Sequence, residues 1–311
     1  MKYGTILGVE TKVSQLVIGS MIFSPEQAAL SYSLLDEFFA AGGNAIDTAY
    51  IYGGGNSERL IGMWMEERKN RSAVFLVDKG AHPTAAGQRA RLAPEEIEHD
   101  LQESLTRLQT DSIDLYMLHR DDSDVPVSTV IDYLNQEIKA GRIQAIGASN
   151  WEHERVQEAN EYAAKRGLKG FVVISNNLSL AVPMEPIWGG VVSVSKAAYD
   201  WHRETQFPLM PWSSQARGFF SGRFTPDNRE DKGMVRVYYN EANFERFRRA
   251  QMLGEKKGYS AIQIALAYVL HQPFPIFPIV GPVSLEELSS CLGALEIQLS
   301  EHEMRWLNLE E

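Results

Sequence analysis

The sequence predicts an α/β fold, a (β/α)8 or TIM barrel, and three observations lead to this prediction. Short apolar runs alternate with longer amphipathic runs along almost all of the 311 residues. The apolar runs are rich in Val, Ile, Leu and Phe, which is typical of parallel strands buried on both faces. Eight such runs occur, and eight strand–helix units fit a closed barrel better than an open sheet.

The eight apolar runs are the expected barrel strands. They cover residues 16–21, 44–49, 74–79, 113–119, 143–149, 171–176, 209–213 and 276–281. Parallel strands need long crossover connections, and the amphipathic runs between them supply these.

The expected helices are bounded by ordinary start and stop signals. Ser24 before Pro25 is typical of a helix start, and Gly167 stands where a helix ends. In residues 94–108 the apolar side chains recur every three or four positions, the spacing of one helix face. The expected helices cover residues 25–41, 94–108, 127–139, 152–166, 194–203, 242–257, 260–271 and 284–295.

Two segments do not follow the alternation. Residues 1–15 are expected to form a short hairpin at the bottom of the barrel. Residues 221–240 are polar and rich in Arg and Tyr, and a loop of that length in a compact domain is usually functional or mobile. Because no linker or low-complexity tract interrupts the chain, we expect a single domain covering residues 1–311.

The composition narrows the class of partner. Thirty Lys and Arg stand against 41 Asp and Glu, a net charge of −11, which disfavours binding to nucleic acid or to anionic membranes. Cys291 is the one cysteine, so no intramolecular disulfide forms. No signal-like or membrane-spanning apolar stretch is present. We therefore predict a cytoplasmic protein that acts on a small molecule, and the pattern leaves its oligomeric state open.

Ionisable side chains stand at the ends of several expected strands, where the active site of such a barrel lies. Asp47 ends the second strand, with Tyr52 just behind it, while Lys79 and His119 end the third and fourth. Charged groups are seldom buried without partners, so these side chains are expected to contact one another. Lys79, held by Asp47, would lower the pKa of the Tyr52 hydroxyl toward neutrality. Tyr52 and a neutral His119 would then stabilise a forming alkoxide, which predicts carbonyl reduction.

Several motifs of the chain resemble those of the aldo-keto reductase family. The stretch Asn-Ala-Ile-Asp-Thr-Ala-Tyr-Ile-Tyr-Gly at 44–53, with Ser-Glu at 57–58, is similar to the family signature. Lys79 in Val-Asp-Lys-Gly and His119 in Leu-Tyr-Met-Leu-His resemble the next two motifs. Residues 141–150 and 212–223 resemble two more. The likeness runs in order over nearly the whole chain.

The resemblance implies a barrel that binds a nicotinamide cofactor, NAD(P)(H), in extended form at the strand ends. It implies that Asp47, Tyr52, Lys79 and His119 are the catalytic tetrad, with Tyr52 as the general acid and base. The hydride would pass between the cofactor and an aldehyde, ketone or sugar. The implied cofactor contacts are Ser20, Met21, Asp47, Ser149, Asn150, Ser175, Trp212, Ser213, Gly218, Arg223, Gly281, Ser284 and Glu287.

Departures from the family pattern bear on the choice of cofactor. Many members carry a basic residue near Val283 or Glu287 that binds the 2′-phosphate of NADPH. Glu287 would repel that phosphate and accept hydrogen bonds from ribose hydroxyls, so we expect NADH to be favoured. Ser175 stands where the family usually has a longer Gln.

The substrate contacts expected besides Tyr52 and His119 are Phe23, Arg120 and Trp151. Arg120 would contact an anionic or polyhydroxylated substrate; the alternative is a salt bridge with one of the acids at 121, 122 and 124. Trp151 would stack on a sugar face or line an apolar pocket.

Other interpretations of these residues remain open at this stage. Asp47 and Lys79 can form a purely structural ion pair. His119 with Asp121 and Asp122 suggests a metal site, although a solvated loop explains those acids better, and we expect no metal. Two further classes are a cofactor-binding regulatory subunit, like the channel-associated members of the family, and a barrel glycosidase, which needs two carboxylates at strand ends.

Overall fold

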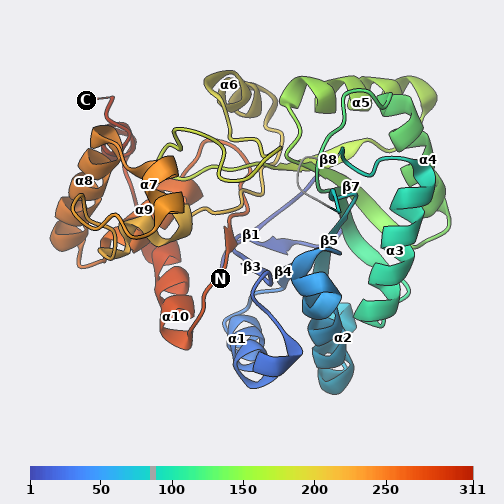
Figure 1. The fold of residues 1–311 in the computed structure, drawn as a ribbon, viewed down its shortest axis with the longest axis horizontal. Coiled ribbons are helices and arrows are strands. Elements are labelled where there is room, and N and C mark those ends of the chain that lie inside the picture. The colour runs from blue at the N-terminus through green and yellow to red at the C-terminus, as the bar shows by residue number, and fades with distance from the viewer. Residues whose placement is uncertain (85–88, 311) are drawn as a thin grey trace.

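Seven parallel strands form the sheet that carries the candidate site, in the order β8-β7-β6-β5-β4-β3-β9 (Figure 1). The structure is a computed structural model, and it describes residues 1–84 and 89–310. The strands are β3 (Val17–Gly19), β4 (Ala45–Asp47), β5 (Phe75–Gly80), β6 (Ile113–Leu118), β7 (Ile143–Ser149), β8 (Phe171–Ser175) and β9 (Ile279–Val280). Each lies inside or close to a predicted apolar run, so the predicted parallel order is confirmed.

The expected strand at 209–213 is reduced to two isolated bridging positions, Leu209 and Trp212, of which Trp212 pairs with Asn177. Leu209 pairs in parallel with Ile174 of β8 on one side and with Ile276, just before β9, on the other. Pro208 and Pro211 flank it and lack the N–H that a longer ladder requires. This position closes the sheet, and the architecture is the expected (β/α)8 barrel.

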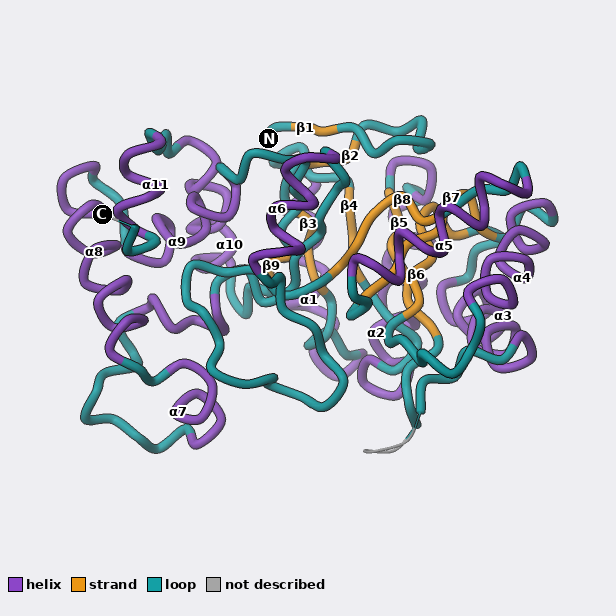
Figure 2. The backbone as a smooth tube through the Cα atoms, turned by 90° about the horizontal axis from the view of Figure 1, so that it is seen from above, coloured by secondary structure: helices purple, strands orange, loops and turns teal. Residues whose placement is uncertain are grey.

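Helices cover the outside of the barrel, and most of them lie where the sequence predicts. These are α1 (Ala28–Ala40), α3 (Pro94–Leu108), α4 (Val127–Lys139), α5 (His153–Arg166), α6 (Lys196–Thr205), α8 (Glu241–Lys257), α9 (Ala261–Leu270) and α10 (Leu285–Gly293). Figures 1 and 2 show α3, α4 and α5 beside β5 to β8, and α8 to α10 gathered at the opposite end of the molecule.

Three helices were not predicted. They are α2 (Asn56–Arg68), α7 (Lys232–Tyr238) and α11 (Glu301–Leu307). The first turn of α2 buries the polar residues Ser57 and Glu58, so its hydrophobic periodicity is weak in the sequence. Helix α7 lies within the segment 221–240 that we had expected to be a loop, and Asp231 caps its start by accepting a hydrogen bond from Met234 N.

The N-terminal hairpin closes the bottom of the barrel, as predicted. Strand β1 (Tyr3–Gly4) pairs antiparallel with β2 (Val13–Ser14). Ile6 and Val13 join the interior cluster formed by the first inward-facing residues of the strands. Gly4 lies so close to the Phe277 ring that a Cβ at this position would be 2.8 Å from it. The opposite end, where the strands finish, is the end that carries the polar side chains.

Within residues 1–84 and 89–310, no helix is both long enough and apolar enough to cross a membrane.

Candidate active site

The alternation of side chains along the strands places candidate catalytic residues inside the barrel, because residues two apart point to the same face of a strand. On β5, Phe75 and Val77 fill the barrel interior, and Lys79 is the next residue on that face. On β6, Met117 lies in the interior and His119 follows it in the same way. The polar site therefore rests directly on the apolar interior of the barrel.

Asp47 and Lys79 form an ion pair inside the mouth of the barrel. Their side chains are 4% and 3% exposed, and Lys79 Nζ donates to Asp47 Oδ1 and to Thr48 O, the latter at 3.0 Å. Burial lowers the pKa of Lys79, but the negative charges of the Asp47 carboxylate and of the Tyr52 phenolate outweigh this effect and leave the pKa raised. Lys79 is therefore a permanent positive charge in the site.

Tyr52 reaches the same place from the turn η2 (Tyr52–Gly55) between β4 and α2. Gly53 and Gly54 adopt left-handed backbone angles in this turn, with φ of 56° and 62°, which glycine adopts without strain. Lys79 Nζ lies 5.2 Å from the centroid of the Tyr52 ring. Burial raises the pKa of the Tyr52 hydroxyl, and this outweighs the lowering by Lys79. The expectation of a lowered pKa was wrong for the protein alone, because desolvation of the phenolate dominates.

His119 packs edge-on against Tyr52, with ring centroids 5.7 Å apart and an interplanar angle of 79°. Burial lowers the pKa of His119 well below its usual value, and the charges of Lys79 and Arg120 lower it further. The ring is therefore neutral at neutral pH. Its Nδ1 is enclosed and has no partner among the described residues. All four residues of the expected tetrad thus meet at one point.

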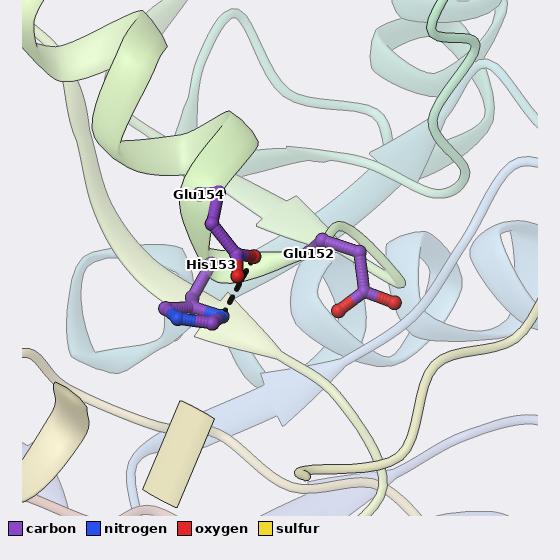
Figure 3. A group of neighbouring side chains, drawn as sticks. All are labelled: Glu152, His153 and Glu154. Atoms are coloured by element: carbon purple, nitrogen blue, oxygen red, sulfur yellow. Dashed lines mark ion pairs between the residues drawn. The ribbon is translucent and has the colours of Figure 1, made fainter. Parts of the chain in front are cut away.

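The alternative metal grouping of His119 with Asp121 and Asp122 does not occur among the described residues. Asp121 instead accepts hydrogen bonds from Arg155, at 3.1 Å from Nε, and this pair holds the loop after β6 against α5. One group of possible metal ligands does occur in the described ranges, formed by Glu152, His153 and Glu154 at the start of α5 (Figure 3). His153 already pairs with Glu154 at 2.9 Å, and both carboxylates are exposed, so the group needs no ion to explain it.

The residues expected at the nicotinamide end of the cofactor lie beside His119. Asn150 has a left-handed backbone, with φ of 58°, and its Nδ2 donates to His119 O at 3.2 Å and to Ser149 Oγ at 3.1 Å. Ser149 Oγ donates to Ser175 O at 3.0 Å. Ser175 Oγ is enclosed and finds no partner in the part of the chain described. The ends of β7 and β8 are therefore joined into one polar surface.

The segment after Leu209 carries the next group of expected cofactor contacts. Trp212 lies with its ring centroid 5.9 Å from that of Trp188, at an interplanar angle of 41°. Ser213 follows with a left-handed backbone, φ 49°. Gly218 also has positive φ, 81°, and a Cβ there would lie 2.9 Å from Arg223 Nη2. The exposed Arg223 guanidinium thus lies over the backbone at Gly218, where no side chain intervenes, and this arrangement suits a site for phosphate.

The residues expected at the adenosine end meet at the start of α10. Ser284 caps this helix by accepting from Glu287 N at 3.2 Å, and Glu287 Oε2 accepts from Val283 N at 2.9 Å. Both Glu287 and the neighbouring Gly281 are exposed. Glu287 is therefore fixed at the surface by its own turn, with a carboxylate oxygen still open to solvent.

Ser20 and Met21 follow β3. Ser20 is fully buried; its Oγ donates to Asp47 O at 2.9 Å and bonds Ser57 Oγ at 2.6 Å. This hydroxyl holds the end of β4 in place and is not directed at a ligand. Met21 is 55% exposed and leaves a flexible apolar side chain at the rim.

Two of the expected substrate contacts are not at the mouth of the barrel. Phe23 is 2% exposed and Trp151 is fully buried, and both belong to the apolar layer between the sheet and the helices. Trp151 packs edge-on against Phe171 and under Arg155. Because neither ring presents a surface to a ligand, both are removed from the expected substrate contacts.

Two aromatic residues near the site were missed in the sequence. His82, in the loop after β5, packs on His119 with ring centroids 4.8 Å apart. Trp188, in the loop after β8, is 44% exposed and packs beside Trp212. The available signal was their position, since loops that follow barrel strands line the active site.

Comparison with known proteins identifies one family and several related oxidoreductases. The pattern of the Aldo/keto reductase family matches residues 15–308. Norsolorinic acid reductase stcV of Emericella nidulans is 29% identical, with 94% of this chain and 77% of that protein aligned. The uncharacterized oxidoreductase YrpG of Bacillus subtilis is 28% identical over 99% of this chain and 95% of its own length. The NADP(+) aryl-alcohol dehydrogenase of Phanerodontia chrysosporium is 29% identical over 89% and 75%.

Among solved structures, the thermostable aldo-keto reductase Tm1743, crystallised with the inhibitor epalrestat, has a similar fold. The TM-score is 0.77, the sequence identity is 23%, and each chain is covered in full.

Proposed function

Because the chain belongs to the aldo/keto reductase family, we propose that it is an oxidoreductase that moves a hydride between a nicotinamide cofactor and a carbonyl compound. The observation that carries the proposal is the convergence of Asp47, Tyr52, Lys79 and His119 at the mouth of the barrel. Such a cluster combines a proton donor, a fixed positive charge and a neutral hydrogen-bond donor.

The chain's own residues account for the proton in this reaction. Tyr52 holds it, since burial raises the pKa of its hydroxyl and keeps the phenol protonated at neutral pH. Lys79 favours the phenolate that forms when the proton leaves, and Asp47 keeps Lys79 in position. His119 is neutral, and with its proton on Nε2 it donates a hydrogen bond to the carbonyl oxygen of the substrate, the atom that receives the proton from Tyr52. In the reverse direction the phenolate takes the proton back.

The residues around the tetrad fit a nicotinamide cofactor. Ser175 Oγ and Trp212 Nε1 are polar atoms without a partner in the described residues, which is uncommon in a completed site. Ser149 and Asn150 are held beside His119 by hydrogen bonds of their own, and the exposed Arg223 offers a charge for the phosphates. When bound, the cofactor supplies or accepts the hydride.

We further propose that NADH is preferred to NADPH. The carboxylate of Glu287 is held at the start of α10 by Val283 N, with one oxygen free to accept from a ribose hydroxyl. The same charge would repel a 2′-phosphate.

The aromatic side chains at the mouth favour an aromatic aldehyde or ketone as the substrate. His82 packs on His119, and Trp188 packs beside Trp212 in the loops that follow the strands; flat rings stack well on such side chains. The names of the norsolorinic acid reductase and aryl-alcohol dehydrogenase relatives agree with this class.

The decisive variant is Tyr52→Phe, which removes only the hydroxyl. We expect kcat for an aromatic aldehyde to fall by about 100- to 10,000-fold, with unchanged binding of NADH measured by quenching of tryptophan fluorescence. The matched control is Tyr50→Phe, because the Tyr50 ring packs on Arg107 at 4.5 Å and away from the tetrad. Full turnover by Tyr52→Phe would exclude this mechanism, and tighter binding of NADPH than of NADH would refute the role given to Glu287.

A further inference from the structure

Arg120 is a buried arginine beside the tetrad that has no carboxylate partner. It is 8% exposed, and its single hydrogen bond within residues 1–84 and 89–310 runs from Nη1 to His119 O at 2.8 Å. A salt bridge with the acids that follow it in sequence was the ordinary explanation. Asp121, however, is taken by Arg155 at 3.1 Å. Since burying an unpaired guanidinium is costly, this arrangement calls for an explanation.

The guanidinium of Arg120 is held next to His119 by its hydrogen bond to the carbonyl oxygen of that residue. Burial lowers the pKa of Arg120, and the one charge that opposes this effect is that of the Tyr52 phenolate. Arg120 in turn lowers the pKa of both His119 and His82, whose rings pack together with centroids 4.8 Å apart. On its other side lies Gly190, where a Cβ would meet Arg120 Cδ at 3.6 Å.

The remaining donors of Arg120 are not enclosed. Neither Nε nor Nη2 is among the fully buried polar atoms that lack a partner, so both still reach solvent. Gly190 carries no side chain and has φ of 68°, which keeps the space beside the guanidinium free. A guanidinium with free N–H groups, fixed by one backbone bond, can bind a carboxylate through two parallel hydrogen bonds.

The local charge also favours an anion. Lys79 and Asp47 neutralise each other, which leaves Arg120 as a net positive charge at the mouth of the barrel. This is an unusual feature in a protein with a net charge of −11.

We propose that Arg120 is a specificity-determining residue that binds a carboxylate carried by the carbonyl substrate. This inference rests on the proposed function and narrows its substrate class to aromatic aldehydes or ketones that are also carboxylic acids. Arg120 acts on recognition and takes no part in the transfer of hydride or proton.

The test compares para-carboxybenzaldehyde with its methyl ester, which has the same aldehyde and no charge. We expect kcat/KM of the wild type to favour the acid by about 10- to 100-fold. Arg120→Met should abolish this ratio, because it lowers kcat/KM for the acid much more than for the ester, while Arg120→Lys should keep part of the ratio. The exposed Arg166 at the end of α5 offers a matched control, and Arg166→Met should keep the full ratio.

Binding without turnover gives an independent measurement. Benzoate should quench tryptophan fluorescence at lower concentration than benzamide in the wild type, and Arg120→Met should remove the difference. Equal use of acid and ester by the wild type, or a preference for the acid that survives in Arg120→Met, would overturn the inference. So would an Arg120→Met variant that weakens NADH binding and leaves the ratio intact. Reduction of the neutral ester tests the proposed function separately.

Discussion

Replacement of Lys79 by methionine tests how strongly the site depends on its buried ion pair. Methionine has a similar length but no charge, so the variant leaves the Asp47 carboxylate enclosed without its partner. Because the two side chains are only 3% and 4% exposed, solvent cannot compensate. Removing one member of a pair this deeply buried costs about 3–5 kcal/mol, a large part of the roughly 5–15 kcal/mol that stabilises a typical protein.

The pH dependence of this loss has a definite sign. Burial raises the pKa of Asp47, and Lys79 opposes that rise in the wild type. In Lys79→Met the opposition is gone, so the folded-state pKa lies further above the unfolded value of about 3.9. The folded state then binds more protons than the unfolded state between these two values. The variant should therefore lose stability as the pH rises through this window and regain it as the pH falls.

The assay is unfolding by guanidinium chloride, followed by tryptophan fluorescence at several pH values. The double variant Asp47→Asn/Lys79→Met should be more stable at neutral pH than Lys79→Met alone, because it buries no unpaired charge. Lys69→Met is the control, since Lys69 is 72% exposed in a surface pair and should have little effect. A Lys79→Met protein as stable as the wild type at neutral pH, with no change on acidification, would refute the reasoning.

Two further predictions concern buried groups near the site and at the cofactor end. A Cβ at Gly80 would overlap the hydroxyl oxygen of Tyr116, so Gly80→Ala should lower the free energy of unfolding by about 1–3 kcal/mol. Adding Tyr116→Phe removes that oxygen and should recover part of the lost stability in denaturant melts. The absence of any recovery would contradict the overlap. Burial and the charge of Glu287 raise the pKa of the Cys291 thiol to about 12. At mildly alkaline pH, Ellman's reagent should therefore label Cys291 only after denaturation. Rapid labelling of the native protein would contradict this prediction, because it would show that the thiol is accessible.

The barrel could be predicted from the sequence because its strands are buried on both faces. Runs such as 74–79 and 113–119 contain few polar residues, and their ends agree with β5 and β6 to within one residue. Helix α2 was missed for the opposite reason. Glu58 is buried there against Arg107, with Oε2 2.9 Å from Nη1, so a charged residue occupies the face that a periodicity argument reserves for apolar ones.

The meeting of Asp47, Lys79 and His119 was predictable because each stands at the end of an apolar strand run, and Tyr52 reaches them from the turn η2 that follows β4. The substrate contacts were not. Phe23 and Trp151 also follow strands, but their side chains turn outward into the helix layer, and the sequence holds no local signal for that choice. His82 and Trp188 stand deeper in their loops, where strand alternation no longer fixes direction. The direction of the pKa shift of Tyr52 depended on how completely the ring is enclosed, which only the folded structure shows.

The closure of the barrel at Leu209 has a consequence for local stability. On one side of this position Ile174 N donates to Pro208 O at 3.1 Å and Met210 N donates to Ile174 O at 2.8 Å. On the other side Leu209 N donates to Pro275 O, Phe277 N to Leu209 O and Ile279 N to Pro211 O, each at 2.9 Å. This seam is shorter than the ladders between β5, β6 and β7, so its amide protons should exchange with solvent sooner than those of these three strands. The four candidate catalytic residues follow or end strands β4, β5 and β6, whereas the segment from Trp212 to Arg223 continues from the seam at Leu209. The candidate catalytic residues and the segment proposed to bind the cofactor are thus held by separate parts of one hydrogen-bond network.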